Sequence, residues 1–214
     1  MNCDALAPYY EPLEHLSFGY SLERRRFAFL NDISRSQRAI LCGDGDGRFL
    51  ARLLQANSRV QIDFVDLSKR MIELAEHRVA KLGPSFQERV RFHHMDVREF
   101  EAPPGAYDLV VTHFFLDCFS EAELPNVVSL LISWATPQTQ WLLSDFREAE
   151  GFLGRAWTCT VIRSLYAAFR LTTGLRVTRL PGYRAALLQA GFCACREENA
   201  VGGLLHSSLW KARG

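Results

Sequence analysis

Short apolar runs alternate with segments of helical periodicity along the first two thirds of the chain. The apolar runs have the length of strands and lie at residues 39–42, 60–65, 90–93, 109–112 and 141–143. The segments with apolar residues at helical spacing lie at residues 49–56, 71–82 and 124–135. This alternation predicts parallel strands joined by helical crossovers, with helices on both faces of the sheet.

The last part of the chain has a different pattern. Pro181-Gly182 precedes a short amphipathic segment at 183–190, and two strand-like runs follow at 192–196 and 204–210, separated by Gly202-Gly203. Such a pattern predicts a helix and then an antiparallel hairpin. The sequence therefore predicts an α/β fold with a doubly wound, mostly parallel seven-stranded sheet, helices on both faces and a C-terminal antiparallel hairpin.

Composition and charge favour a globular protein with a small-molecule partner. The chain has 214 residues, of which 48% are hydrophobic and 23% are charged, which suits a single domain with a large core. Lys and Arg number 25 against 24 Asp and Glu, so the net charge gives no strong attraction to nucleic acid.

Location and metal binding are also constrained by the sequence. No stretch reaches the roughly 18 apolar residues of a membrane span, and the N-terminus lacks the pattern of a signal peptide. We therefore expect no integral membrane segment and a cytoplasmic location. The six cysteines are dispersed without the spacing of zinc ligands, so we expect reduced thiols and no metal site.

Three glycines at alternating positions follow the first predicted strand, in the string Gly43-Asp44-Gly45-Asp46-Gly47. Glycine lets the backbone take positive φ and approach a ligand closely, and the helix that follows offers unpaired N–H groups. A dinucleotide fingerprint requires a third glycine or alanine where this chain has Arg48, which argues against NAD. The Gly-Lys-Ser/Thr of a nucleoside triphosphate loop is also missing from this stretch of sequence.

Two acidic residues follow neighbouring predicted strands. Asp66 ends the second strand, where a carboxylate can accept hydrogen bonds from both hydroxyls of a ribose. Asp96 follows the third strand and can accept a hydrogen bond from an adenine amino group. Because the carboxyl ends of neighbouring parallel strands lie at one edge of a sheet, both side chains are expected to line one crevice. Together they favour an adenosine without phosphates.

The string Asp66-Leu67-Ser68-x-x-Met71-x-x-x-Ala75, after this glycine loop, resembles the class I S-adenosylmethionine-dependent methyltransferases. Within that superfamily the start, with Tyr9-Tyr10 and Ser17-Phe18-Gly19, is similar to the ubiquinone/menaquinone C-methyltransferases, as is the ending around Ala190-Gly191-Phe192. The resemblance covers nearly the whole chain. It implies a methyltransferase whose cofactor is S-adenosyl-L-methionine.

The resemblance also implies roles for particular residues. Gly43, Gly45 and Gly47 would flank the methionine part of the cofactor, Asp66 would hold the ribose, and Asp96 with the Val97 amide would read the adenine. The family usually has an acidic residue two positions before the first glycine; here that position is Leu41, and Asp44 is the candidate substitute for contact with the cofactor's amino group. The full set of expected cofactor contacts is Gly43, Asp44, Gly45, Gly47, Asp66, Leu67, Met71, Asp96 and Val97.

The segment that begins at His113, after the fourth predicted strand, is expected to face the acceptor, because ligands bind outside the carboxyl ends of such strands. His113 is the candidate base since the ordinary pKa of histidine is near neutrality, although it can equally be a strand-end residue beside the cofactor. Asp117 is the second catalytic candidate or else a residue near a helix N-terminus. The expected substrate and lid residues are Tyr9, Tyr10, Phe18, Phe114, Asp145 and Arg147.

The chain is expected to form one methyltransferase domain with four parts. Residues 1–35 would be an N-terminal helical cap, which the resemblance implies folds over the cofactor, and residues 36–145 the cofactor-binding core. Residues 146–180, with aromatic and apolar residues at helical spacing, would be a lid insertion or else an extra packing helix. Residues 181–214 would supply the closing helix and edge hairpin.

Three functions stay open at this point. The leading hypothesis is a methyltransferase for a small, hydrophobic or aromatic acceptor. A noncatalytic adenosylmethionine-binding module and an NAD-dependent oxidoreductase on a similar sheet are the alternatives. The Gly-Asp-Gly string also resembles the polyamine aminopropyltransferases, which carry an Asp-rich stretch after the fourth strand where this chain has His113-Phe114-Phe115.

Overall fold

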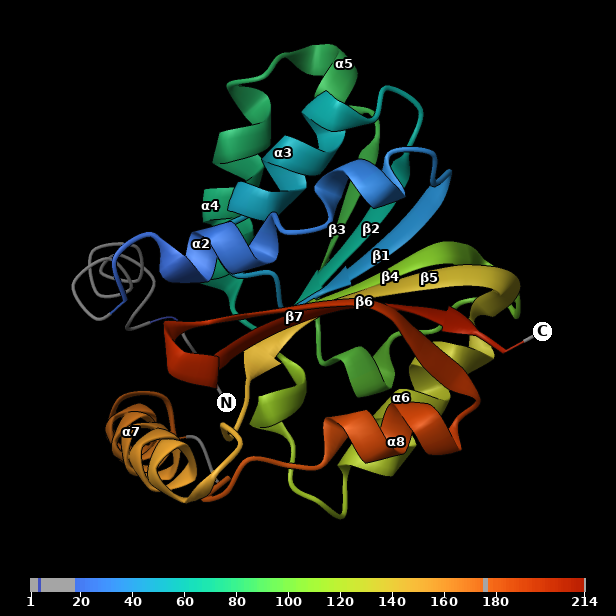
Figure 1. Ribbon diagram of the computed structural model, residues 1–214. Helices are drawn as coiled ribbons and strands as arrows, with labels where there is room; N and C mark the ends of the chain where they lie inside the picture. The colour runs from blue at the N-terminus through green and yellow to red at the C-terminus, as the bar shows by residue number, and fades with distance from the viewer. Residues whose placement is uncertain (1–3, 5–17, 175–176, 214) are drawn as a thin grey trace.

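A seven-stranded sheet forms the centre of the computed structural model, which describes residues 4, 18–174 and 177–213 (Figure 1). The strands are ordered β3-β2-β1-β4-β5-β7-β6. Their bounds are β1 Arg38–Cys42, β2 Gln61–Asp66, β3 Val90–His94, β4 Tyr107–His113, β5 Ala135–Phe146, β6 Phe192–Ala200 and β7 Leu205–Ala212. The first five run parallel, and β7 joins β5 in an antiparallel pairing that adds the β6–β7 hairpin at the edge. The predicted fold is confirmed.

Helices cover both faces of this sheet. Figure 1 shows one group above the sheet and one group below it. The upper group is α2 Ser21–Arg26, α3 Arg48–Ala56, α4 Lys69–Ala80 and α5 Pro84–Gln87. The lower group is α6 Leu124–Ser133, α7 Phe152–Thr173 and α8 Tyr183–Gln189. Short 3-10 turns complete the chain: η2 Leu30–Ile33, η3 Val97–Glu99, η4 Leu116–Cys118 and η5 Val201–Gly203. Among the described residues, the helices are too short or too polar to cross a membrane.

Alternate side chains of the central strands feed two separate cores. Leu109 and Val111 of β4 pack with α3 and α4, whereas Val110 packs on the opposite face with α6 and α8. These side chains have no exposed surface, and burying one of this size contributes about 1.5–3 kcal/mol. A third, smaller cluster joins α7 to the end of β5 through Phe146, Ile162 and Tyr166.

Two strands are longer than their hydrophobic pattern predicts. β5 begins at Ala135, although polar residues such as Thr139 occupy its first half. The Thr139 hydroxyl is buried and donates a hydrogen bond to the Tyr107 carbonyl, 2.7 Å away, so a polar residue takes part in the pairing of β5 with β4. β6 extends to Ala200 as an edge strand, where polar residues remain accessible to water. Hydrophobic periodicity underestimates such strands because backbone pairing holds them without apolar side chains.

The carboxyl ends of β1, β2 and β4 lie at one side of the sheet, toward the left of Figure 1. The same side of the molecule carries α2 and α7. Loops from three parallel strands thus meet between these two helices, which defines where a ligand site is expected. The division of the chain into cap, core, lid and closing hairpin remains a prediction.

Gly47 is expected to be a point where the fold tolerates no side chain. Its φ is +75°, and a Cβ built there would lie 2.7 Å from Cβ of Ala75 on α4. Gly105 is a matched control because its φ is +70° and its surroundings are open. Left-handed backbone strain alone costs about 1–2 kcal/mol for an alanine. Gly47→Ala should lose roughly a further 1–3 kcal/mol of unfolding free energy through overpacking against α4. Urea unfolding measures both variants, and equal losses would contradict the expectation.

Candidate active site

The glycine loop after β1 has the backbone conformation that its sequence predicts. Gly43, Gly45 and Gly47 have φ values of +62°, +72° and +75°. The Gly43 amide donates to the Val65 carbonyl of β2, 2.9 Å away, and a Cβ on Gly43 would overlap the ring of Phe115. Gly47 instead permits the close approach of α4. Its predicted place beside a cofactor stays a prediction, whereas its packing role is evident.

The acidic residues of this loop turn toward the protein. One oxygen of the buried Asp44 carboxylate accepts the Leu50 amide of α3 (3.2 Å), and the other lies 3.1 Å from Nδ1 of His113. Asp46 forms ion pairs with Arg48 and Arg78 at 3.0 and 2.9 Å. The predicted contact of Asp44 with a cofactor amino group is untested, and the carboxylate contacts His113 and α3 instead.

Asp66 stands at the carboxyl end of β2, as predicted. Its Oδ1 accepts the Ser68 amide at 2.8 Å. Burial, together with the nearby Asp44 and Asp4 carboxylates, raises the pKa of Asp66 to about 6 against the lowering effect of the Ser68 and Gly45 amides. Asp4 Oδ1 accepts the Ser68 hydroxyl at 2.6 Å, which places residue 4 beside this strand end. No sequence pattern marks Asp4, and its position was missed.

The remaining cofactor candidates lie along the neighbouring strand ends. Asp96 accepts three hydrogen bonds from Arg98, at 2.9 Å from the amide, 2.9 Å from Nε and 2.6 Å from Nη2, and Arg98 holds the pKa of Asp96 below its ordinary value. Val97 is buried in the turn after it, and Leu67 is 42% exposed in the turn after β2. Met71 is buried on α4 and its amide donates to the Ser68 hydroxyl, which caps that helix.

His113 ends β4 with its imidazole fully enclosed. Nδ1 faces Asp44, and the ring meets Phe49 edge-on with centroids 4.4 Å apart. Nε2 is buried and has no hydrogen-bond partner among the described residues. Burial lowers the pKa of His113, and the nearby positive charge of Arg26 adds to this, while Asp44 opposes it. A neutral ring that donates its Nδ1 proton to Asp44 presents an unprotonated Nε2, which is the form a base requires.

An aromatic cluster follows His113. Phe114 has a φ of +51°, a conformation that costs of order 1–3 kcal/mol for a non-glycine residue and that gathers at functional sites. Its ring lies 5.3 Å from that of Phe146, which in turn lies 6.0 Å from Phe18. The Arg26 guanidinium carbon lies 5.2 Å from the Phe114 ring centroid. The other predicted lid residues, Tyr9 and Tyr10, lie outside the described residues.

Asp117 and Asp145 meet in the buried space between the ends of β4 and β5. Asp145 Oδ2 accepts the Asp117 amide at 3.3 Å, and the Tyr166 hydroxyl of α7 lies 3.4 Å from Asp117 Oδ2. Burial raises the pKa of Asp117 to about 6. Burial and the neighbouring Asp117 raise the pKa of Asp145 well above its ordinary value. Two enclosed carboxyl groups this close resist ionising together.

Arg147 is separate from the other candidates. Its Nη2 pairs with Glu150 at 2.7 Å, and its Nη1 lies 3.5 Å from the Asn199 amide oxygen of β6. The structure therefore brings the glycine loop, Asp66 and His113 together, and places the Asp117–Asp145 pair beside the Phe114 cluster. Phe115 and Tyr166 join this site through contacts between distant segments, which sequence spacing does not reveal.

Comparisons with known proteins bear on the family and the fold of the chain. Residues 40–138 match the family model described as "Methyltransferase domain". Polyamine aminopropyltransferase 2 from Bacillus cereus is 31% identical to the chain over 83 residues, and the enzyme of that name from Bacillus anthracis is 32% identical over 83 residues. Each of these matches covers 36% of this chain and 23% of the relative, so the chain spans less than a quarter of the curated relatives that it matches.

Solved structures share the fold at low sequence identity. The mitomycin 7-O-methyltransferase MmcR has a TM-score of 0.68 at 16% identity, over 96% of this chain and 58% of that chain. The Burkholderia thailandensis 1,6-didemethyltoxoflavin-N1-methyltransferase has a TM-score of 0.65 at 16% identity, over 96% of this chain and 85% of that chain. The N-methyltransferase NodS from Bradyrhizobium japonicum WM9 has a TM-score of 0.63 at 13% identity, over 91% and 89%.

The family match and the shared fold support the predicted enzyme class, an S-adenosylmethionine-dependent methyltransferase, and with it the predicted cofactor. They do not narrow the superfamily to the quinone C-methyltransferases.

Asp117→Asn should change how stability depends on pH. Because the folded pKa of Asp117 is raised, the folded protein holds a proton between roughly pH 4 and 6 that the unfolded chain releases. Stability of the wild type should therefore fall as pH rises through this window, by about 2–3 kcal/mol for a shift of this size. The variant lacks the titrating group, so its unfolding free energy should fall less over the same pH range.

Urea unfolding at pH 4, 5, 6 and 7 measures this difference. Glu150→Gln is the control because that carboxylate is 88% exposed in the side chain. Parallel curves for the wild type and Asp117→Asn would contradict the expectation of a buried, protonated pair.

Proposed function

We propose that the protein transfers a methyl group from S-adenosyl-L-methionine to a small, hydrophobic or aromatic acceptor, with His113 as the base. The observation that carries this proposal is the meeting of the glycine loop, Asp66 and the Asp44–His113 pair at the carboxyl ends of β1, β2 and β4. The family match and the shared fold support the reaction class. The identity of the acceptor is proposed only as far as its chemical class.

The residues present fit the cofactor in charge and shape. Asp66 carries a raised pKa partly because Asp44 and Asp4 lie near it, so three carboxylates lie close together at the end of β2. A ligand with a positive sulfonium relieves their mutual repulsion. In the proposal Asp66 holds the ribose hydroxyls, the Gly43 and Gly45 backbone lies beside the methionine part, and Leu67 and Asp96 lie beside the adenine. The solved NodS neighbour contains S-adenosyl-L-homocysteine.

The side chains around His113 would prepare the acceptor for reaction. S-adenosyl-L-methionine supplies an activated methyl group when it is bound. In the proposal Asp44 accepts the Nδ1 proton of His113 and so keeps Nε2 unprotonated, and the acceptor reaches this enclosed atom once the side chains that cover it move apart. Phe114, Phe146 and Phe18 would exclude water and align a flat apolar acceptor, an effect that belongs to proximity and orientation. The similarity of the terminal segments to quinone C-methyltransferases favours the same class of acceptor.

The alternative functions fit the structure less well. Arg48 is buried at the start of α3 and paired with Asp46, so a large side chain fills the place that a dinucleotide fingerprint keeps for glycine. A noncatalytic binding module gives no reason for a strained Phe114 beside an enclosed histidine. Aminopropyl transfer to an amine is the second candidate, because two aminopropyltransferases match part of the chain and the Asp117–Asp145 pair offers carboxylates near the acceptor side.

Asp66→Ala should weaken binding of S-adenosyl-L-homocysteine by tenfold or more, since a hydrogen bond to a charged group contributes about 1.5–3 kcal/mol. Asp108→Ala is the matched control: that carboxylate accepts the Gln37 and Arg38 amides at the opposite end of β1 and should leave affinity unchanged. Isothermal calorimetry measures both, with NAD as a ligand expected not to bind. Unchanged affinity in Asp66→Ala, or binding of NAD, would overturn the cofactor assignment.

His113→Gln should lower kcat by roughly 10²–10⁴, the usual contribution of a positioned base, with little change in S-adenosyl-L-homocysteine affinity. The pKa of His113 lies below its ordinary value, so the acidic fall of wild-type kcat, caused by protonation of Nε2, should lie at a lower pH than an ordinary histidine would give. The variant should lose this acidic limb.

The acceptor for this assay comes from a screen with labelled S-adenosyl-L-methionine, scored by the mass gain of one methyl group. Asp44→Asn should also lower kcat, because it removes the carboxylate that accepts the Nδ1 proton of His113. Full activity in His113→Gln would assign the histidine to a strand-end role, and a mass gain of an aminopropyl group would favour the second candidate.

A further inference from the structure

A groove runs along α7 on the side that faces residues 178–180. Its volume is about 500 Å³, within the range of roughly 300–1,000 Å³ that small-molecule sites occupy. Arg155, Arg163 and Arg179 are among the residues that line it, together with the apolar residues Ile162 and Leu180. It is separate from the glycine loop, because its lining belongs to α7 and to the two segments that flank it in sequence.

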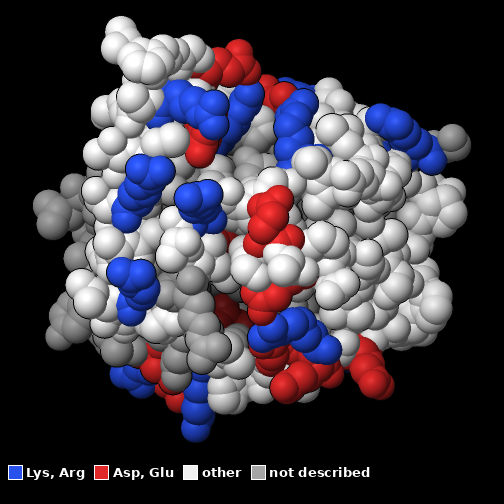
Figure 2. Space-filling view, turned by 90° about the horizontal axis from the view of Figure 1, so that it is seen from below, with Lys and Arg blue, Asp and Glu red and all other residues white. Residues whose placement is uncertain are grey.

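The charge of the groove is positive. Glu148, which also lines it, pairs with Arg155 through an Nε–Oε2 distance of 2.9 Å. Within the described part of the chain, Arg163 and Arg179 have no carboxylate partner. Figure 2 shows Lys and Arg side chains along the left part of the lower face, where Figure 1 places α7, with few acidic side chains among them. Two guanidinium groups are therefore available to an anion.

The apolar floor of the groove is fixed in place. Ile162 is only 3% exposed because its side chain packs in the cluster that contains Phe146 and Tyr166. Val177 belongs to the same cluster and anchors the chain just before residues 178–180. Ile162 and Val177 thus tie both sides of the groove, α7 and the chain before residues 178–180, to the same apolar cluster.

We propose that this groove binds a small organic anion. Its carboxylate or phosphate oxygens would pair with Arg163 and Arg179, since guanidinium groups match both anions through paired hydrogen bonds. Its apolar body would lie on Ile162 and Leu180. The site is distinct from the methyl-transfer centre, and the inference does not depend on the proposed reaction.

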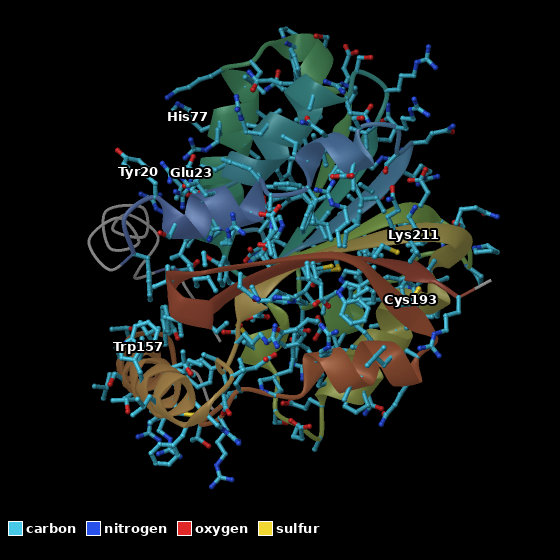
Figure 3. All side chains as sticks on the ribbon, in the orientation of Figure 1. Tyr20, Glu23, His77, Trp157, Cys193 and Lys211 are labelled. Carbon is cyan, nitrogen blue, oxygen red and sulfur yellow. The ribbon has the colours of Figure 1, made fainter. Side chains whose placement is uncertain are left out.

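Cys159 provides a local readout, because this free, half-buried thiol lines the groove. The experiment measures its alkylation by neutral iodoacetamide, peptide by peptide, by mass spectrometry. Benzoate and phenyl phosphate serve as anionic probes and benzamide as the uncharged match of benzoate. At ten times its dissociation constant, a bound probe should slow alkylation of Cys159 about tenfold. Cys193 is the internal control, since Figure 3 places it at the far side of the molecule from Trp157 of α7.

The paired substitution Arg163→Gln with Arg179→Gln should abolish this protection. Arg170→Gln is the matched control, because Arg170 lies on α7 but does not line the groove. Melting temperatures of all variants verify folding. If benzoate alone protects Cys159, the result supports a carboxylate ligand. If phenyl phosphate alone protects it, the result supports a phosphate ligand. Protection by both probes supports an anion site that accepts either group. Absent protection, equal protection by benzamide, or an equal loss in Arg170→Gln would overturn the proposal.

Discussion

The carboxylate of Asp44 holds together the three elements that form the site. A buried charge must be compensated, and here the compensation comes from the Leu50 amide at the start of α3 and from the His113 ring at the end of β4. The loop after β1 is consequently fixed to both its own helix and the neighbouring strand. The conformation of the glycine loop, the tautomer of His113 and part of the raised pKa of Asp66 all depend on this one group.

The same arrangement explains why the acidic residues of the loop are not simple replacements for the carboxylate that the family usually carries at the position of Leu41. Leu41 has no exposed surface and belongs to the apolar core between β1 and the helices α3 and α4. Asp44 lies beyond the strand, where it can reach inward to His113. The carboxylate thus stays near the end of β1, where it contacts His113 and contributes to the raised pKa of Asp66.

The fold was predictable because its signal is local. Apolar runs, helical spacing and glycine positions each act over a few residues, and together they located the seven strands and the helices α3, α4, α6 and α8. The site was predictable only where a residue's position in a strand fixes its place, as for Asp66 and His113. Contacts such as Asp117 with Asp145, or Phe115 with Gly43, join segments that are distant in sequence. The hydrogen bonds of Asp63 to Tyr107 and His93 are likewise evident only from the pairing of strands in the sheet.

Unfavourable local features are concentrated in the few residues after β4. Phe114 adopts a left-handed backbone, Nε2 of His113 is buried without a partner among the described residues, and Asp117 is an enclosed carboxyl group beside a second one. Each lowers stability, by amounts of order 1–3 kcal/mol for strain or for an unpaired polar group. The packing of β4 against two apolar cores is what keeps such a segment in place. Strained and unpaired groups of this kind gather at functional sites, so their concentration after β4 is consistent with the proposal that the acceptor binds beside this segment.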